Sequence, residues 1–412
     1  MEVKKTAIPK RLVLAASIAA MLGTAPTFAQ DANDIKATFR DGLRFETADK
    51  QHSFGITGRV HFDYRSFSPS DSVANTFDIR RARLGFNGKV YENINFEVVG
   101  EFTAGTSLDV AWINYGFFGK NAQIRVGQFK MPFHLETLMS SNNITFQERS
   151  FSSSLAPGKE RGVMVHGSPA AGFTYAVAAS IGAGQNNNES DPVEDDMDLM
   201  GRVTFNIPEM MGNKDIVGHL GLAYTTTTQP AGATTSGIRT EGRGATFFAG
   251  TTPGVAYDRD RLGLEAAFAT GPFKVQAEWV NVEFDAAGSK RELDTYYIYG
   301  AWAITGESYA KAYRNGVFGG IKPSKQYGKE GGTGAWVVGV RYDKWDAGDF
   351  PAGTFTGTGE ADAITVGLNW HPTGMTRFML NYIMTDYDTP VTVNGVARDD
   401  EKAITLRAQI NW

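Results

Sequence analysis

The chain has 412 residues, no cysteine and a formal net charge of −5 at pH 7. The absence of cysteine excludes disulfides, thiolate metal sites and cysteine nucleophiles. The acidic balance argues against nucleic acid as a partner, because binding to nucleic acid depends on basic residues that neutralise phosphates. Glycine (47 residues) and aromatic residues (12%) are abundant while proline (15 residues) is sparse, which favours a β-protein with many turns.

The first 29 residues have the layout of a cleaved secretory signal peptide. A basic start is followed by an apolar run from Leu12 to Leu22 and by small residues up to Ala29. The apolar run is shorter than the roughly 20 residues that a membrane helix needs. Removal of residues 1–29 takes away four basic residues and one acidic residue, so the mature chain carries a charge of −8. We therefore expect an exported protein in which residues 30–52 form a short periplasmic N-terminal segment.

From about residue 53 to the end of the chain, apolar and polar residues alternate. In the last such segment the apolar even positions from Ile404 to Trp412 share one face, and the polar odd positions from Thr405 to Asn411 share the other. We count about 16 such segments of about ten residues, the length that a tilted membrane strand requires. A soluble β-sandwich also alternates, but one with this many strands would divide into domains joined by linkers, and the sequence contains none.

These segments predict an all-β fold: a transmembrane antiparallel β-barrel of about 16 strands over residues 53–412, closed because lipid cannot satisfy free backbone groups. Short turns at 91–93, 270–272 and 371–373 alternate with long connections at about 130–158, 184–197, 227–258, 346–360 and 388–399. Short periplasmic turns and long extracellular loops are typical of outer-membrane barrels. Residues 306–332 depart from this pattern, because they are long and the strand count places them on the periplasmic side.

Strand parity predicts that eight arginines face the lumen: Arg59, Arg81, Arg83, Arg125, Arg261, Arg341, Arg377 and Arg407. An anion pore needs fixed positive charge, and the planar guanidinium fork suits phosphate. Arg80 has the wrong parity to face the lumen unless its strand bulges or Arg80 lies at the rim. Inward carboxylates such as Asp63, Glu97 and Asp343 leave open a mixed wall in which arginines pair with acids.

Several short stretches are informative through their order and spacing along the chain: Gly58-Arg59, Arg80 to Leu84, Ile124 to Phe129, Thr305-Gly306-Glu307 with Tyr309, Ile321-Lys322-Pro323, Gly334 to Trp336, Arg341 to Asp343, and Gly367 to Trp370. Together they resemble the phosphate-selective porins, the O and P porins of Gram-negative outer membranes. The resemblance implies a homotrimer of 16-stranded barrels, in which residues of about 130–158 fold inward as a constriction loop. It also implies an anion site that includes Arg80 and Arg81, together with a lysine from the loop. Residues 135–143 contain no lysine.

We expect a pore for passive diffusion of small anions, including phosphate or polyphosphate, in the Gram-negative outer membrane, where lipid and lipopolysaccharide surround it. The predicted anion pathway consists of Arg59, Arg80, Arg81, Arg83, Arg125, Lys130 and Arg341. No catalytic residue, cofactor or metal site is predicted, since the acidic stretch 189–198 fits a solvated loop better than a cation site. A weakly selective general porin is the main alternative. A barrel hydrolase using His166 and Ser168, or a structural or adhesin barrel without conductance, is the distant one.

Overall fold

The computed structural model describes residues 34–39, 42–69, 73–116, 118–182, 184–185, 197–232, 234–235, 237–251, 253–329, 331–351 and 353–412. The predicted signal peptide and residues 189–196 of the acidic stretch lie outside these ranges. Within them, no helix is long and apolar enough to cross a membrane.

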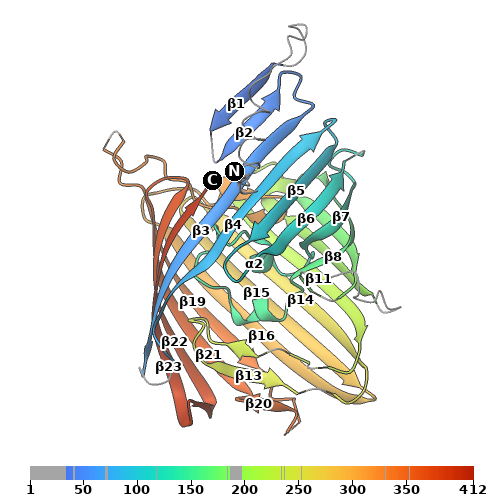
Figure 1. Cartoon of the computed structure of the whole chain (residues 1–412), viewed down its shortest axis with the longest axis vertical. Coiled ribbons are helices and arrows are strands. Elements are labelled where there is room, and N and C mark those ends of the chain that lie inside the picture. Colours follow the sequence, from blue (N-terminus) through green and yellow to red (C-terminus); the bar gives the residue numbers. More distant parts are fainter. Residues whose placement is uncertain are drawn as a thin grey trace, which may run out of the picture.

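Sixteen antiparallel strands form a closed barrel, which confirms the predicted fold class (Figure 1). The last strand pairs with the first, from Lys402 opposite Ser68 to Asn411 opposite Arg59, and this closes the ring. In chain order the strands are β3 (Ser53–Ser68), β4 (Thr76–Val90), β5 (Ile94–Glu101), β6 (Ser107–Tyr115), β7 (Gln123–Lys130), β8 (Lys159–Ala170), β9 (Phe173–Ser180), β10 (Asp198–Asn206), β11 (Ile216–Gln229), β14 (Tyr257–Thr270), β15 (Phe273–Ala286), β16 (Ser289–Ala303), β19 (Ala335–Asp346), β21 (Glu360–His371), β22 (Thr376–Val393) and β23 (Val396–Asn411).

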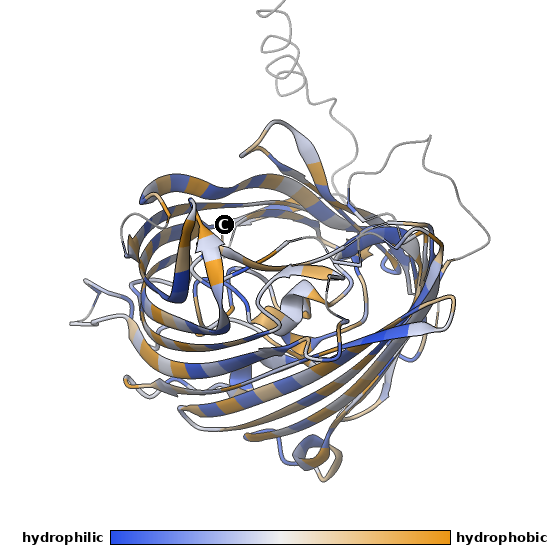
Figure 2. Cartoon of the chain, turned by 90° about the horizontal axis from the view of Figure 1, so that it is seen from below, coloured by the Kyte–Doolittle hydropathy of each residue, from blue (hydrophilic) through white to orange (hydrophobic). Residues whose placement is uncertain are grey.

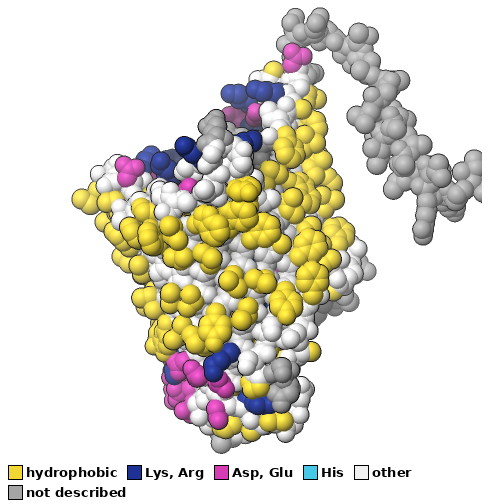
Figure 3. Space-filling view, turned by 90° about the vertical axis from the view of Figure 1, so that its left-hand side faces the viewer, with side chains coloured by type: hydrophobic (Ala, Val, Ile, Leu, Met, Phe, Trp, Pro, Cys, Tyr) yellow, Lys and Arg dark blue, Asp and Glu magenta, His cyan; other side chains and the backbone are white. Residues whose placement is uncertain are grey.

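The alternation in the sequence sorts side chains between the two faces of this barrel. Leu406 is 43% exposed on the outside, whereas its neighbour Arg407 is 2% exposed in the lumen. Figure 2 shows the same alternation of hydrophilic and hydrophobic residues along the strands. In Figure 3 the outer surface carries a broad apolar band between charged ends, as a lipid-facing barrel requires.

The C-terminus and the first described residues lie at one end of the barrel, which we call the periplasmic end because its turns are mostly short. There β1 (Ile35–Phe39) and β2 (Leu43–Thr47) form a hairpin that joins the sheet through β3. The short helix α3 (Ile207–Met210) lies in another connection at this end. The long segment between β16 and β19 also lies here, so the strand count was right and this connection is unusual.

One predicted loop is instead a long hairpin. Residues 388–399 were expected to form an open connection, but β22 and β23 continue through most of this stretch to a two-residue turn at Asn394-Gly395. Both turn residues have positive φ, 50° and 79°, the conformation of the tight hairpin turns for which Asn-Gly is favoured. A register shift between Asp386 and Val391 interrupts the ladder, and beyond it Val391 is buried in the hydrophobic cluster at the outer end.

Four connections fold into the barrel and fill one side of its lumen: one inward loop, two outer loops and one periplasmic segment. The inward loop, residues 131–158, contains helix α2 (Leu135–Leu138) and the 3-10 turn η1 (Phe151–Ser154). At the outer end, β12 (Ile238–Arg239) and β13 (Thr246–Gly250) of one loop and β20 (Phe355–Gly357) of another form a small sheet, here called the outer-loop sheet. The periplasmic segment, residues 304–334, contributes η2 (Ala310–Ala312), β17 (Tyr313–Arg314) and β18 (Val317–Phe318).

Two hydrophobic clusters fix these connections against the wall formed by β14–β23. The outer cluster joins Phe247 and Phe248 of the outer-loop sheet to Trp345 of β19, and all three side chains are fully buried. The inner cluster joins the inward loop, through Leu135 and Phe146, to the periplasmic segment. The lumen is therefore packed on the β14–β23 side and open on the β3–β10 side.

Candidate functional site: the open side of the lumen

A cavity of about 960 Å³ runs between the inward loop and the wall of β3–β10, and the periplasmic segment borders its inner end. The described lining contains three carboxylates, Glu97, Asp109 and Glu209. It contains ten basic side chains: Arg59, Arg81, Arg83, Lys120, Arg125, Lys130, Arg149, Lys159, Arg202 and Lys214. The excess of positive charge makes this cavity the candidate path for an anion.

A bulge in β4 places two consecutive arginines in the lumen. His61 of β3 lies opposite Arg81, but Phe62 lies opposite Ile79, so Arg80 is the extra residue. The bulge resolves the parity problem of the sequence, because a bulged strand can direct neighbouring side chains to one face. Ile79 remains outside and is 51% exposed, while Arg80 and Arg81 both point inward.

Arg59 and Arg81 reach the cavity without a carboxylate partner among the described residues. The Arg59 guanidinium donates to the hydroxyl of Ser141 at 2.9 Å and lies 3.4 Å from that of Ser140, both in the inward loop. The Arg81 guanidinium lies 3.5 Å from Nδ1 of His61. Neutral partners orient these cations, and neither one is in ion-pair contact with a described carboxylate.

Helix α2 of the inward loop positions two further cations through its free carbonyl groups. The Lys130 ammonium donates to the carbonyl oxygens of Thr137 (2.7 Å), Leu138 (3.2 Å) and Met139 (2.7 Å). Arg149 donates to the Met139 carbonyl at 2.8 Å. The last carbonyl groups of a helix lack partners within the helix, so two cations satisfy them here. The carbonyl groups carry no net charge, so they orient Lys130 and Arg149 without an ion pair.

The other end of α2 is fixed to the wall by an acid. The Glu278 carboxylate of β15 accepts the backbone N–H groups of Leu135 (2.5 Å) and Glu136 (2.8 Å). His134 begins the helix with its side chain buried, and burial lowers the pKa of this imidazole to about 3. The inward loop is thus held at both ends of its one helix.

The remaining lining cations are partly neutralised or stacked. Arg83 forms ion pairs with Glu101 and Asp109, each at 2.7 Å, and Lys159 also contacts Asp109. Arg125 lies over the ring of Trp112, with its guanidinium carbon 4.2 Å from the ring centre. A cation on an aromatic face keeps its full charge, so Arg125 adds to the positive field while Arg83 and Lys159 add less.

A second set of arginines holds the inward loop rather than the cavity. Glu148 of this loop accepts two hydrogen bonds from Arg80, at 2.9 and 3.2 Å, and one from Arg407 at 3.0 Å. Burial alone would raise the pKa of Glu148, but the charges of Arg80, Arg81 and Arg407 lower it well below its ordinary value. Glu148 is therefore an ionised anchor for the loop.

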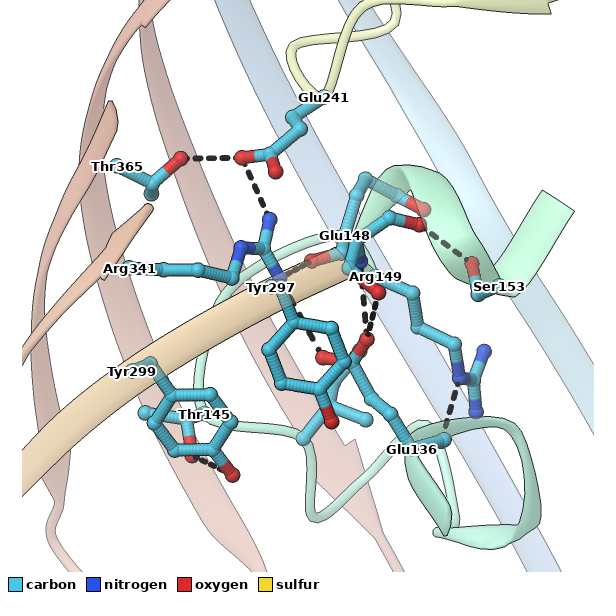
Figure 4. A network of polar contacts seen from close by, with 12 residues as sticks. Glu136, Thr145, Glu148, Arg149, Ser153, Glu241, Tyr297, Tyr299, Arg341 and Thr365 are labelled. Atoms are coloured by element: carbon cyan, nitrogen blue, oxygen red, sulfur yellow. Dashed lines mark hydrogen bonds and ion pairs between the residues drawn. The ribbon is translucent and has the colours of Figure 1, made fainter. Parts of the chain in front are cut away.

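Arg341 lies on the packed side of the lumen (Figure 4). Its guanidinium contacts Glu241 of the loop before β13 at 2.5 Å, Glu136 of the inward loop at 3.3 Å and Asp343 at 3.4 Å. The side chain is 1% exposed and lies over the ring of Phe146. Arg341 does not belong to the described lining of the cavity, and its charge is matched by surrounding carboxylates.

The structure thus brings five of the seven predicted pathway residues to the cavity: Arg59, Arg81, Arg83, Arg125 and Lys130. Arg80 anchors Glu148, and Arg341 lies behind the inward loop. Sequence reasoning missed Arg149, which lies within the inward loop just before η1, and Lys159, which begins β8. Only Lys159 gave a signal in the sequence, because it stands at the start of a strand. His166, proposed for the hydrolase alternative, contacts Asn114 at 2.7 Å.

Comparison with known proteins agrees with this geometry. The model of the family "Phosphate-selective porin O and P" matches residues 54–412. Porin O of Pseudomonas aeruginosa is 28% identical, over 98% of this chain and 97% of that protein. Among solved structures, the outer membrane channel DcaP of Acinetobacter baumannii (TM-score 0.55, 10% identity) is similar over 89% of this chain and 99% of that one. OmpT of Vibrio cholerae (TM-score 0.53, 11% identity) is similar over 88% and 98%.

The fold and its basic cavity define a porin of the outer membrane. The family match is more specific, because it spans nearly the whole barrel. The chain belongs to the phosphate-selective porin O and P family, a family of channels.

Proposed function

We propose that the channel conducts small anions by passive diffusion and binds phosphate or short polyphosphate at the cation cluster. This cluster consists of Arg59, Arg81, Lys130 and Arg149. The observation that carries the proposal is their set of partners: hydroxyl groups, an imidazole and backbone carbonyls, with no carboxylate in ion-pair contact among the described residues. Their field therefore acts on the solute.

Phosphate fits the cluster for two physical reasons. A guanidinium offers two parallel N–H groups that match two phosphate oxygens, and an ammonium adds a compact charge. Donors fixed in the wall can replace part of the hydration shell of the ion as it enters. Lys120 and Lys214 continue the positive lining toward the periplasmic end, so a longer anion can contact more than one cation at a time.

The test is the reversal potential of the purified protein in a planar bilayer across a KCl gradient, followed by addition of phosphate. We expect an anion-selective sign and block of chloride current by low phosphate concentrations. Arg81→Gln should reduce the anion preference and weaken the block several-fold. Lys344→Gln, which removes a cation from the outer rim, is the matched control and should change neither.

A weakly selective general porin is the rival function. It is favoured by the pairing of Arg83 and Lys159 with Asp109, which places a carboxylate in the same cavity. This rival predicts a reversal potential near zero, no phosphate block, and the same ion preference in Arg81→Gln as in the unchanged protein. Absence of any conductance would contradict both the anion-selective channel and the general porin.

A homotrimer within lipid and lipopolysaccharide is the proposed assembly. Strands β5, β7 and β9 have 8 residues each, whereas β14, β15 and β22 have 14, 14 and 18. Eight residues at about 3.3 Å each and a tilt of about 40° span about 20 Å, less than the apolar band of about 25 Å. A neighbouring copy would cover this short wall, and one structure of V. cholerae OmpT is described as a trimer form. Molar mass from light scattering in detergent tests this assembly.

A further inference from the structure

The periplasmic segment sends a small hairpin across the lumen. Its strands are β17 and β18, and its turn is Asn315-Gly316, with positive φ values of 48° and 75°. The base of the hairpin is fixed on the packed side, where Tyr313 and Phe318 are buried with residues of the inward loop. Lys274 of β15 strengthens this base, since its ammonium lies 4.7 Å from the ring centre of Phe318 and 5.1 Å from that of Tyr309.

The turn of the hairpin reaches the barrel wall at β9 and β10. Arg202 of β10 donates to the carbonyl oxygen of Gly316 at 3.0 Å, and the Tyr313 hydroxyl lies 2.7 Å from Nδ1 of His219 on β11. A Cβ atom on Gly316 would lie 2.7 Å from the hydroxyl of Thr204 and 3.1 Å from that of Thr174. Only glycine permits so close an approach, and the hairpin therefore crosses from the β16–β19 side to β9 and β10.

The crossing lies on the path of the solute. Tyr313, Asn315, Gly316 and Val317 line the same cavity as the cation cluster. Lys120 and Lys214, in the periplasmic turns, also line this cavity beyond the cluster. An anion that leaves the cluster toward the periplasm must pass between the hairpin and the wall of β3–β8.

We propose that this hairpin is a size filter at the periplasmic exit, separate from the cation cluster. Among the lining residues that the hairpin contributes, none carries a charge, so the filter acts by volume and not by sign. The hairpin is held in place at its turn by Arg202 and at its base by the buried side chains of Tyr313 and Phe318. Compact inorganic anions pass, whereas organic phosphates with a bulky group, such as sugar phosphates and nucleotides, are retained.

Two variants change the filter in opposite directions. Removal of Asn315 and Gly316 shortens the hairpin and should open the exit, while Val317→Trp should narrow it. The matched control removes Asn394 and Gly395, the same dipeptide in the outer hairpin of β22 and β23, where a Cβ on the glycine would meet nothing within 4 Å. Circular dichroism and heat-modifiable migration on gels establish that each variant folds.

The readouts are single-channel conductance and the rates at which graded solutes enter proteoliposomes. The solutes are inorganic phosphate, glycerol phosphate, glucose phosphate and adenosine monophosphate, with neutral mono-, di- and trisaccharides in parallel. The shortened variant should raise the rate of the largest solutes relative to the smallest at least threefold, and Val317→Trp should lower conductance at least twofold. The sign of the reversal potential should remain that of the unchanged protein.

The proposal would be overturned if the entry rate of the largest solutes, relative to the smallest, were the same in the unchanged protein, the shortened variant and Val317→Trp. If the shortened chain does not fold, Val317→Trp decides by itself, because conductance equal to that of the unchanged protein contradicts a filter at the exit. The inference names the size class of solute for the proposed anion path, but its test is independent of that path. The neutral sugars report on the filter even if reversal potentials show no anion preference.

Discussion

The two sides of the lumen use the same residue types for opposite purposes. On the packed side, Arg341 is surrounded by Glu136, Glu241 and Asp343, and its charge is matched within the protein. On the open side, Arg59 and Arg81 contact hydroxyl groups and an imidazole. Both sets of arginines face inward from the strands of one barrel, Arg341 from β19 and the other two from β3 and β4. What separates a structural arginine from a solute-binding one here is the partner, not the burial or the strand.

The difference shows how a wide barrel becomes a narrow pore. A ring of 16 strands encloses more space than its own side chains fill, so other segments must occupy part of it. The aromatic clusters attach four connections to the β14–β23 wall and leave the solute path on the other side. The inward loop is then the common boundary, because one face packs against hydrophobic residues and the other presents Lys130 and Arg149 to the cavity.

Removal of Arg341 from the packed side should have the largest effect on the stability of the protein. Arg341→Met leaves Glu136, Glu241 and Asp343 buried without their cation, and a broken buried pair costs about 3–5 kcal/mol. We expect a correspondingly lower free energy of unfolding, measured by urea unfolding in lipid vesicles, with the anion-selective sign of the reversal potential retained. Arg81→Met is the counterpart, with a small loss of stability and a large loss of anion preference. An Arg341 variant that loses anion preference at full stability would place Arg341 on the pathway.

The stability of the inward loop, which separates the two sides of the lumen, should depend on pH through its anchor Glu148. The pKa of Glu148 is lowered in the folded protein, so its stabilising contribution is complete above the ordinary value of 4.5 and is lost as the pH falls below it. Glu148→Gln should lower the thermal midpoint at pH 7, and the curves of the two proteins should approach one another as the pH falls below 4.5. Other carboxylates titrate in both proteins, and the difference between the curves isolates Glu148. Parallel curves over this range would contradict the role of Glu148 as an ionised anchor.

The barrel was predictable because membrane strands repeat every two residues and each repeat is visible in the sequence. The same parity correctly sent Arg59, Arg81 and Arg407 to the lumen. Parity cannot show which part of a lumen a residue faces, and for this reason Arg341 was grouped with the pathway. The bulge at Arg80 depends on the register between β3 and β4, which a single strand does not reveal.

The connections that shape the pore were the least predictable part. In the outer-loop sheet and the periplasmic segment, apolar and polar residues do not alternate regularly. The positions of these segments follow from aromatic contacts with distant strands, such as Phe248 with Trp345 at 5.1 Å between ring centres. Arg149 becomes visible as a lining cation only when the inward loop has folded back on helix α2. The loop lysine implied by family resemblance is absent from residues 135–143, and Lys130 and Arg149 supply positive charge at the same helix.

The smallest effect is expected outside the lumen. Lys344 projects from β19 at the outer rim and contacts Glu360 at 2.9 Å and Asp362 at 3.2 Å, both on β21. Exposed pairs contribute less than about 1 kcal/mol, because water and salt screen them. Neighbouring carboxylates lie directly opposite one another here, as Asp346 does with Glu360, so the lysine also reduces repulsion between like charges.

Lys344→Gln should therefore lower the free energy of unfolding by no more than about 1 kcal/mol at low ionic strength, and by less in 1 M salt, where the screening length falls to about 3 Å. Urea unfolding at the two salt concentrations measures this difference, and the reversal potential should not change. A shift in ion preference would mean that charge outside the barrel reaches the solute. In that case the partners within the lumen would no longer suffice to explain which arginines act on the anion.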